Sequence, residues 1–126
     1  METTELLVSE EQALQVANDF RQAIQIGVLM ALGAHNLRAS QGTTGYGALT
    51  FDAIILPFNE DGTRADLAEV MTVDVAHTWD DLIDVTVIRP DGSEHYKGES
   101  LYIDQINKTL FALDWNGKET LNPRIV

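Results

Sequence analysis

The stretch that decides the fold is Val70–Arg89, VMTVDVAHTWDDLIDVTVIR, in which two alternating segments flank a short polar run. Apolar and polar side chains alternate from Val70 to His77 and again from Leu82 to Arg89. A period of two is the spacing of a strand that buries one face. Between the two segments, Thr-Trp-Asp-Asp offers short acceptors that bond neighbouring amides in turns. The stretch therefore predicts two neighbouring strands of an antiparallel sheet.

Two more segments are predicted to belong to the same sheet. Gly47–Pro57 alternates in the same manner, and it is followed by the turn residues Asn-Glu-Asp-Gly at 59–62. The Pro-Asp-Gly turn at 90–92 leads into a short return strand over Ser93–Lys97. These segments raise the number of predicted strands to four.

Helices are predicted towards the two ends of the chain. Ser9, with Gln12 three residues later, has the form of a capping box, and apolar residues then recur at helical spacing. This first helix is expected over Glu10–Leu32, with Gly33 closing it in a left-handed conformation. A second helix is expected over Tyr102–Leu113, ended by the Asn-Gly pair at 116–117.

The length and composition suit a single α+β domain spanning residues 1–126. Its expected architecture is one antiparallel sheet of about four to five strands with the N-terminal and C-terminal helices on one face. Residues 1–8 and 117–126 are expected to be loose ends. Because the sequence has no cysteine, disulfides, thiolate metal sites and a cysteine nucleophile are excluded.

The same composition predicts a soluble protein of the cytoplasm. The N-terminal residues lack the basic and apolar regions of a signal peptide. The longest apolar stretch, Ile26–Leu32, is far shorter than the ~20 residues that cross a bilayer. No membrane association is therefore expected.

Acidic residues dominate the charge of the chain. Twenty Asp and Glu against eight Lys and Arg give a net charge of −12. Residues 12–51 carry one acid and two bases, whereas residues 52–104 carry thirteen acids and three bases, a net of −10. Binding to nucleic-acid phosphates needs clustered Lys and Arg. The chain is therefore not expected to bind nucleic acid directly.

The predicted sheet collects carboxylates on its polar face. Asp52, Asp74 and Asp84 fall on the polar side of their strands, and Asp80 and Asp81 lie in or beside the turn. One interpretation is a solvated surface that discourages edge pairing. Another is an interaction surface, because crowded carboxylates repel one another unless solvent or a partner compensates them. A divalent cation is a third option, but there is no D-x-D-x-D-G loop, and no metal site or cofactor is predicted.

The remaining candidates are single residues and one glycine-rich segment. The histidines are His35, His77 and His95. They lack the paired spacing of a zinc site, so turn or surface positions are expected. The glycine-rich residues 42–47 precede a strand and contain no lysine, which favours a flexible hairpin connection over a phosphate loop. Trp79 and Trp115 lie at the ends of predicted elements, where a tryptophan either caps the core or anchors a partner.

Four short motifs also follow one another in a recognisable order. They are ALGAHNL at Ala31–Leu37, LTF at Leu49–Phe51, DLIDV at Asp81–Val85 and YIDQI at Tyr102–Ile106. With them, residues 25–113 resemble a broad group of small uncharacterised proteins encoded by bacteriophages and other mobile elements. That group tends to show Gly-Ala-Lys-Asn-aromatic, L-x-F, D-L-Y-D-V and Y-x-D-Q-L in this order. The chain departs from the pattern at His35, where lysine is usual, and at Ile83, where tyrosine is usual.

The resemblance implies an origin in a phage or prophage acting inside a bacterium, and a small, non-enzymatic accessory protein. It carries over no activity and no binding residue. Combined with the charge of residues 52–104, it leads to the hypothesis of a binding protein. Its acidic sheet face would engage a basic site on a host or phage protein, such as a nucleic-acid-binding channel of a defence system.

Two other classes of function stay open. The first is a structural subunit of a homo-oligomer or virion assembly, which would associate through edge strands or the apolar residues Val28–Leu32. The second is small-ligand binding, or a small hydrolase or metal-dependent enzyme using the aspartates and His77. No convergent nucleophile, base and orienting group can be named from the sequence, which ranks an enzyme below a binding protein.

Overall fold

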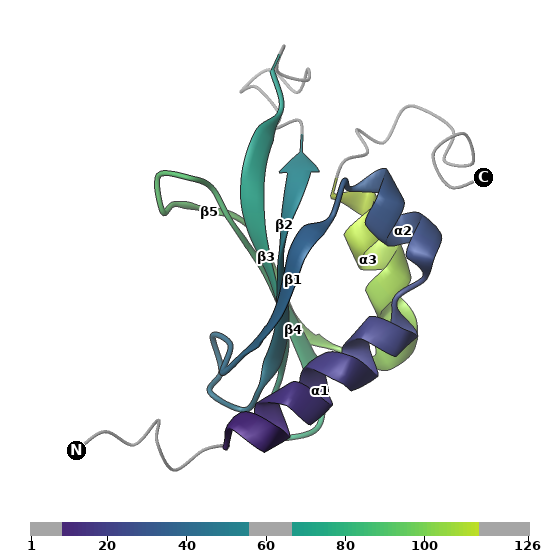
Figure 1. Ribbon diagram of the computed structural model, residues 1–126, viewed down its shortest axis with the longest axis vertical. Coiled ribbons are helices and arrows are strands. Elements are labelled where there is room, and N and C mark those ends of the chain that lie inside the picture. The colour runs from purple at the N-terminus through teal and green to yellow at the C-terminus, as the bar shows by residue number, and fades with distance from the viewer. Residues whose placement is uncertain (1–8, 56–66, 114–126) are drawn as a thin grey trace.

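The computed structural model describes residues 9–55 and 67–113, and Figure 1 shows their arrangement. Five strands form one antiparallel sheet in the order β1-β2-β3-β4-β5. They are β1 (His35–Ser40), β2 (Ala48–Ile55), β3 (Glu69–His77), β4 (Ile83–Ile88) and β5 (Glu94–Leu101). The helical elements are α1 (Glu10–Ala23), α2 (Ile26–Ala31), the 3-10 helix η2 (Ile103–Gln105) and α3 (Ile106–Ala112). The three α-helices lie on one side of the sheet, so the predicted α+β architecture is confirmed (Figure 1).

The core lies between the sheet and the helices. Alternate side chains of β2, β3 and β4 face the helices and are buried, as the period of two predicts. They pack in one cluster with the apolar side chains of α1, α2 and α3. The strand members are Leu49, Phe51, Ala53, Ile55, Met71, Val73, Val75, Ile83, Val85 and Val87, and the helical members include Phe20, Ile24, Val28, Leu29, Leu32, Ile106, Leu110 and Phe111.

Strand β1 is absent from the sequence-based prediction, and β5 is longer than predicted. The sequence of β1, HNLRAS, does not alternate, and most of its residues are exposed because it forms an edge of the sheet. Strand β5 continues to Leu101 because two irregularities in its pairing with β4 each accommodate an extra residue. The predicted turn at 59–62 and the predicted helix stop at 116–117 lie outside the described residues.

The other face of the sheet carries the polar residues in register. Arg38, Thr50, Asp74, Thr86 and Lys97 stand opposite one another in one row that crosses all five strands. Directly opposed residues of a sheet share a face. The predicted sharing of one face by the carboxylates and threonines of β2, β3 and β4 is therefore confirmed. This face is called the outer face below.

The prediction of one continuous first helix is wrong. The capping box at Ser9 is present, with Gln12 N donating to Ser9 Oγ over 3.1 Å and Ser9 N donating to Gln12 Oε1 over 2.8 Å. Helix α1 nevertheless ends at Ala23, and the chain turns through an extended Ile24 and Gln25 before α2 begins. Gly33, at φ 61°, then leads the chain away from α2, in the left-handed conformation expected of it.

Asn107 of α3 satisfies the backbone groups that this break exposes. Its Oδ1 accepts a hydrogen bond of 2.7 Å from Gln25 N, and its Nδ2 donates one of 3.1 Å to Ala23 O. An uncompensated backbone donor and acceptor would otherwise be left at the junction. One amide side chain therefore fixes the break and ties it to the C-terminal helix.

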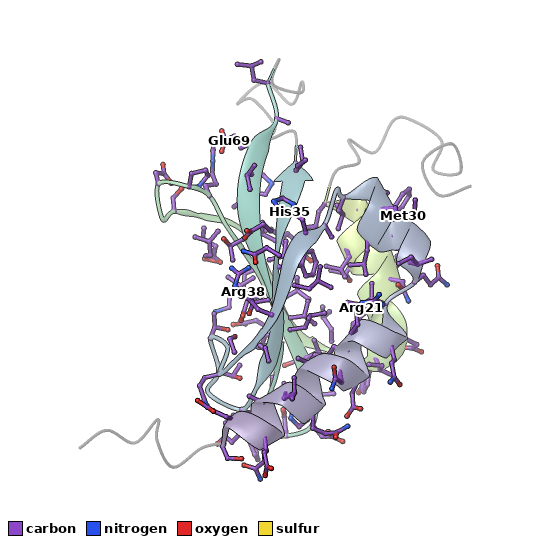
Figure 2. The ribbon with its side chains drawn as sticks, in the orientation of Figure 1. Arg21, Met30, His35, Arg38 and Glu69 are labelled. Atoms are coloured by element: carbon purple, nitrogen blue, oxygen red, sulfur yellow. The ribbon has the colours of Figure 1, made fainter. Side chains whose placement is uncertain are left out.

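The break turns α2 onto the sheet and buries Val28 and Leu29, whereas Ile26, at the start of the helix, stays exposed. Val28, Leu29 and Leu32 are all buried, so Val28–Leu32 does not form the exposed apolar end proposed from the sequence for self-assembly. Met30 also has 73% of its surface exposed, and it lies on the side of α2 away from the sheet (Figure 2).

Replacing Asn107 by alanine is expected to lower the free energy of unfolding by about 1–3 kcal/mol, since it leaves Gln25 N and Ala23 O without partners. Alanine has the higher helix propensity, so propensity would act in the opposite direction. Urea denaturation followed by circular dichroism measures the difference. Asn18→Ala, on the exposed surface of α1, is the matched control and should lose nothing. Equal stability of Asn107→Ala and wild type would show that the bridge does not hold the break.

Candidate functional site

The β3–β4 turn is built on Thr78. Its backbone N–H donates to Leu82 O over 3.0 Å, and its Oγ1 accepts from Leu82 N over 2.9 Å. Its carbonyl oxygen accepts from Asp81 N over 3.1 Å, and Asp81 adopts a left-handed φ of 67°. Thr78 is buried, whereas Trp79 at the tip of the turn has 79% of its surface exposed. Of the two roles weighed for Trp79, packing into the core does not fit this exposed position.

A cleft of about 600 Å³ opens beside this turn, between α1, the ends of β3 and β4, and η2. Val16, Phe20 and Ile83 supply apolar side chains, and Tyr102 and Ile103 stand exposed at its edge. Its polar lining residues are Asp19, His77, Asp81 and Asp104. We call it the acidic cleft. Its size and mixed lining fall within the range of binding pockets.

His77 and Asp81 form the best-defined contact in the acidic cleft. His77 Nε2 and Asp81 Oδ1 share a hydrogen bond of 2.7 Å, and the imidazole meets the Phe20 ring edge-on with centroids 6.4 Å apart. His77 faces the helices, because it pairs with the inward-facing Ile83. Such a pair orients an imidazole for acid–base work. Among the described residues that line the cleft, none is a serine, threonine or cysteine.

Within the described residues, the carboxylates of the acidic cleft have no lysine or arginine as a partner. Asp19 accepts a hydrogen bond of 2.9 Å from the Gln15 amide, and Asp81 has only the imidazole of His77. Within residues 9–55 and 67–113, no lysine or arginine lies at ion-pair distance from Asp19, Asp81 or Asp104. Negative charge is therefore concentrated here over apolar side chains.

The turn sends its two adjacent aspartates to opposite sides of the sheet. Asp81 belongs to the acidic cleft, while Asp80 lines a smaller hollow of about 310 Å³ on the outer side, together with Trp79, Asp84 and Glu99. The expectation that Asp80 and Asp81 extend a single acidic surface is therefore wrong for Asp81. The cause is the left-handed backbone of Asp81, which turns its side chain away from that of its neighbour.

Asp80, Asp84 and Glu99 on the outer side each have a partner within the protein. Asp80 accepts a hydrogen bond from the Thr78 hydroxyl, and Asp84 accepts one of 3.0 Å from Ser100 N. Glu99 lies 3.4 Å from Lys97 Nζ. These contacts satisfy the side chains that would otherwise repel one another.

Asp52 has the most complete set of partners on the outer face. It accepts hydrogen bonds from Asn36 Nδ2 at 3.2 Å and from Arg38 Nη2 at 3.4 Å, and Thr72 Oγ1 lies 3.5 Å away. Figure 2 labels Arg38 on β1, from which it reaches this carboxylate. The Asn36 hydrogen bond, followed by the charge of Arg38, holds the pKa of Asp52 below its usual value, although partial burial acts the other way.

Asp74 is not accessible to a partner. Only 7% of its surface is exposed, because residues 41–47 fold across it between β1 and β2. Thr43 N donates to Asp74 Oδ2 over 2.9 Å, and Thr50 Oγ1 donates to Asp74 Oδ1 over 2.9 Å. The glycine-rich segment is thus a hairpin connection, as predicted, but one fastened to the sheet. A Cβ at Gly42 would lie 2.6 Å from Ala48 Cβ, which explains the glycine at that position.

Sequence reasoning named Asp81, His77 and Trp79 but missed the residues that surround them. Asp19 and Phe20 come from α1, and Asp104 comes from η2, far apart along the chain. The sequence gives only a weak indication that Asp19 belongs to the cleft. It is the one acid in residues 12–51, and it lies beside a core position of the predicted helix. Trp115, the other predicted anchor, lies outside the described residues.

The other expectations concern metals, histidines and membranes. Within the described parts of the chain, no group of three or more histidine, aspartate or glutamate side chains is arranged to hold a metal ion. His35 shares a hydrogen bond of 2.9 Å with Gly33 O, and His95 lies on β5 far from the acidic cleft. No helix in those parts is long and apolar enough to cross a bilayer.

Comparison of the chain with protein-family models, curated proteins and solved structures finds no match.

Asp52→Asn is expected to be less stable than wild type at pH 7, by ~1 kcal/mol or less. Because the folded-state pKa is lowered, the ionised carboxylate contributes stability above its unfolded-state pKa of about 3.9. That contribution is lost as the pH falls through the lower folded-state pKa, so the two proteins should converge in acid. Urea denaturation at several pH values measures this, with Glu94→Gln, exposed on the same face, as the control. A difference that stays constant with pH would contradict the assignment.

Proposed function

We propose that the chain is a non-enzymatic binding protein of a phage or other mobile element, and that it engages a basic site on another protein. The contact surface is the edge of the molecule formed by Trp79 and the acidic cleft. The motif resemblance supports the origin, and the charge distribution supports the chemistry of the partner. A nucleic-acid-binding channel of a host defence system is the kind of basic site that an acidic protein can occupy.

The observation that carries the proposal is the contrast between two sets of carboxylates. On the outer face, Asp52, Asp74 and Asp84 already have partners within the chain. In the acidic cleft, Asp104 has no hydrogen-bond or ion-pair partner among the described residues, and Asp19 has only the Gln15 amide. Both line the cleft together with apolar side chains. A lysine or arginine of a partner would find both charge and an apolar surface for its stem there. The binding surface inferred from the sequence is accordingly moved from the outer face to this edge.

Trp79 adds an exposed anchor on the β3–β4 turn, where it lines the outer hollow and is two residues from Asp81 of the acidic cleft. Exposed tryptophans at the centre of an interface commonly contribute ~2 kcal/mol or more to binding. Here the turn holds the tryptophan by backbone hydrogen bonds through Thr78, which reduces the loss of freedom on binding. The partner that fits this surface best has basic side chains around an apolar pocket that accepts the Trp79 side chain.

Self-association is the second candidate, and one observation favours it. Ile54 and Val70 are opposed across β2 and β3 on the outer face, and both are about half exposed. Leu67, just before β3, is exposed as well. An apolar patch at the end of a sheet is a common contact between identical subunits.

The first proposal is tested by capture from a bacterial lysate with immobilised wild-type protein and three variants, quantified by mass spectrometry. Asp19→Asn/Asp104→Asn removes two charges from the acidic cleft, and Trp79→Ala removes the anchor. Asp52→Asn/Glu94→Gln removes two charges from the outer face and is the matched control. A protein retained by wild type should be lost from the first two variants by ~30-fold or more in affinity and kept by the control.

Excess duplex DNA should displace that protein if its basic site handles nucleic acid. Equal retention of the captured protein by all four baits would contradict the assignment of the surface. Equal loss from both double variants would show that binding depends on net charge and not on the acidic cleft. Recovery of copies of the chain alone would favour the second candidate.

A further inference from the structure

A second large cleft, of about 480 Å³, lies between β5 and α3. Its polar lining residues are His95, Tyr96, Gln105, Lys108 and Thr109, and Ala112 and Leu113 supply apolar surface. Among the described residues that line it, none carries a carboxylate. This is unexpected in a chain with twenty acids and eight bases. We call it the β5–α3 cleft, and it shares no lining residue with the acidic cleft.

A bulge in β5 forms one wall of this cleft. Tyr96 pairs with Val87 and Glu94 pairs with Ile88, so His95 is an extra residue between two consecutive positions of β4. Bulges re-aim side chains, and this one brings both His95 and Tyr96 to the side of the strand that faces α3. A regular strand would have sent one of the two to the outer face.

The opposite wall, on η2 and α3, presents hydrogen-bond donors. Gln105 Oε1 already accepts a hydrogen bond of 2.8 Å from Tyr102 N, which leaves its amide NH₂ group as the free end. Lys108 is exposed, and no acid within the described residues lies at ion-pair distance from it. Thr109 and Tyr96 add hydroxyl groups.

Among the described residues that line the cleft, Lys108 is the one that carries a charge at pH 7. Burial, followed by the positive charge of Arg89, lowers the pKa of His95, although Glu69 acts the other way. The imidazole is therefore neutral at pH 7 and can donate one hydrogen bond. Arg89 is ion-paired with Glu69, with its Nη2 2.5 Å from Glu69 Oε2, so Lys108 is the cation that lines the described part of the cleft.

We propose that the β5–α3 cleft binds a small organic carboxylate with a flat apolar body. Lys108 and the amide of Gln105 hold the carboxylate, and Ala112 and Leu113 contact the apolar part. Charge-assisted hydrogen bonds from a lysine are the stronger kind, and the volume suits a ligand of this size. This inference does not depend on the proposed protein-binding surface, and either can fail without the other.

The test uses benzoate and benzamide, which share shape and size but differ in charge. In ¹⁵N–¹H correlation spectra of the full chain, benzoate should shift the amide signals of residues 94–98 and 105–113 in a saturable manner. A dissociation constant of about 1 mM is expected for so small a probe. Benzamide should bind ~10-fold more weakly, because it lacks the charge that Lys108 recognises.

Lys108→Met keeps most of the apolar stem and removes the charge, so it should weaken benzoate ~10-fold and leave benzamide unchanged. Lys97→Met is the matched control. Lys97 lies on the outer face of β5, outside the cleft, so this variant should bind benzoate like wild type. The spectra themselves report whether each variant is folded. Equal affinity for benzoate and benzamide, an unaffected Lys108→Met variant, or benzoate shifts confined to other residues would each overturn the proposal.

Discussion

The two hydrogen bonds of Asn107 connect the two ends of the described chain. They join α3 to the break between α1 and α2, across 82 and 84 positions of sequence. The end of α1 is thereby held against the C-terminal helix, and η2 leads directly into that helix. The two walls of the acidic cleft, with Asp19 and Phe20 on α1 and Asp104 on η2, are therefore set by the same bridge that orders the core.

The fold distributes the charged side chains unevenly over the surface of the protein. Bulges in β1 and β5 supply local partners for the outer face, where Asn36 binds Asp52 and Ser100 binds Asp84, each from a residue with positive φ. In the acidic cleft, Asp19 and Asp104 have no cationic partner among the described residues. The β5–α3 cleft, in contrast, is lined by donors. A strongly acidic chain thus keeps distinct regions that suit cationic and anionic groups.

The sequence predicted β2, β3 and β4 because a sheet covered on one side imposes a period of two on its residues. It could not predict β1, whose polar, exposed residues carry no such period. The break after Ala23 was equally hidden, since its cause is a side chain from a distant helix and the local residues continue the helical pattern. Tertiary contacts of this kind override local propensity.

In the candidate site, too, some features follow from the local sequence and others depend on tertiary contacts. The face on which Asp52, Asp74 and Asp84 lie follows from alternation alone, and it was predicted correctly. Their accessibility does not follow from it, because the burial of Asp74 depends on how residues 41–47 fold back over the sheet. The side taken by Asp81 depends on a single left-handed φ, and the contribution of Asp19 depends on how α1 packs.

The central claim is that a partner protein docks at the edge formed by Trp79 and the acidic cleft. Site-specific photo-crosslinking in living bacteria tests it most directly, with p-benzoylphenylalanine placed at Tyr102, an exposed aromatic position of the cleft, or at Val70 on the outer face. The account predicts a crosslink to a second, different protein from position 102 and none to that protein from position 70. A crosslink to the same protein from position 70 alone, or crosslinks from position 102 only to another copy of this chain, would contradict it.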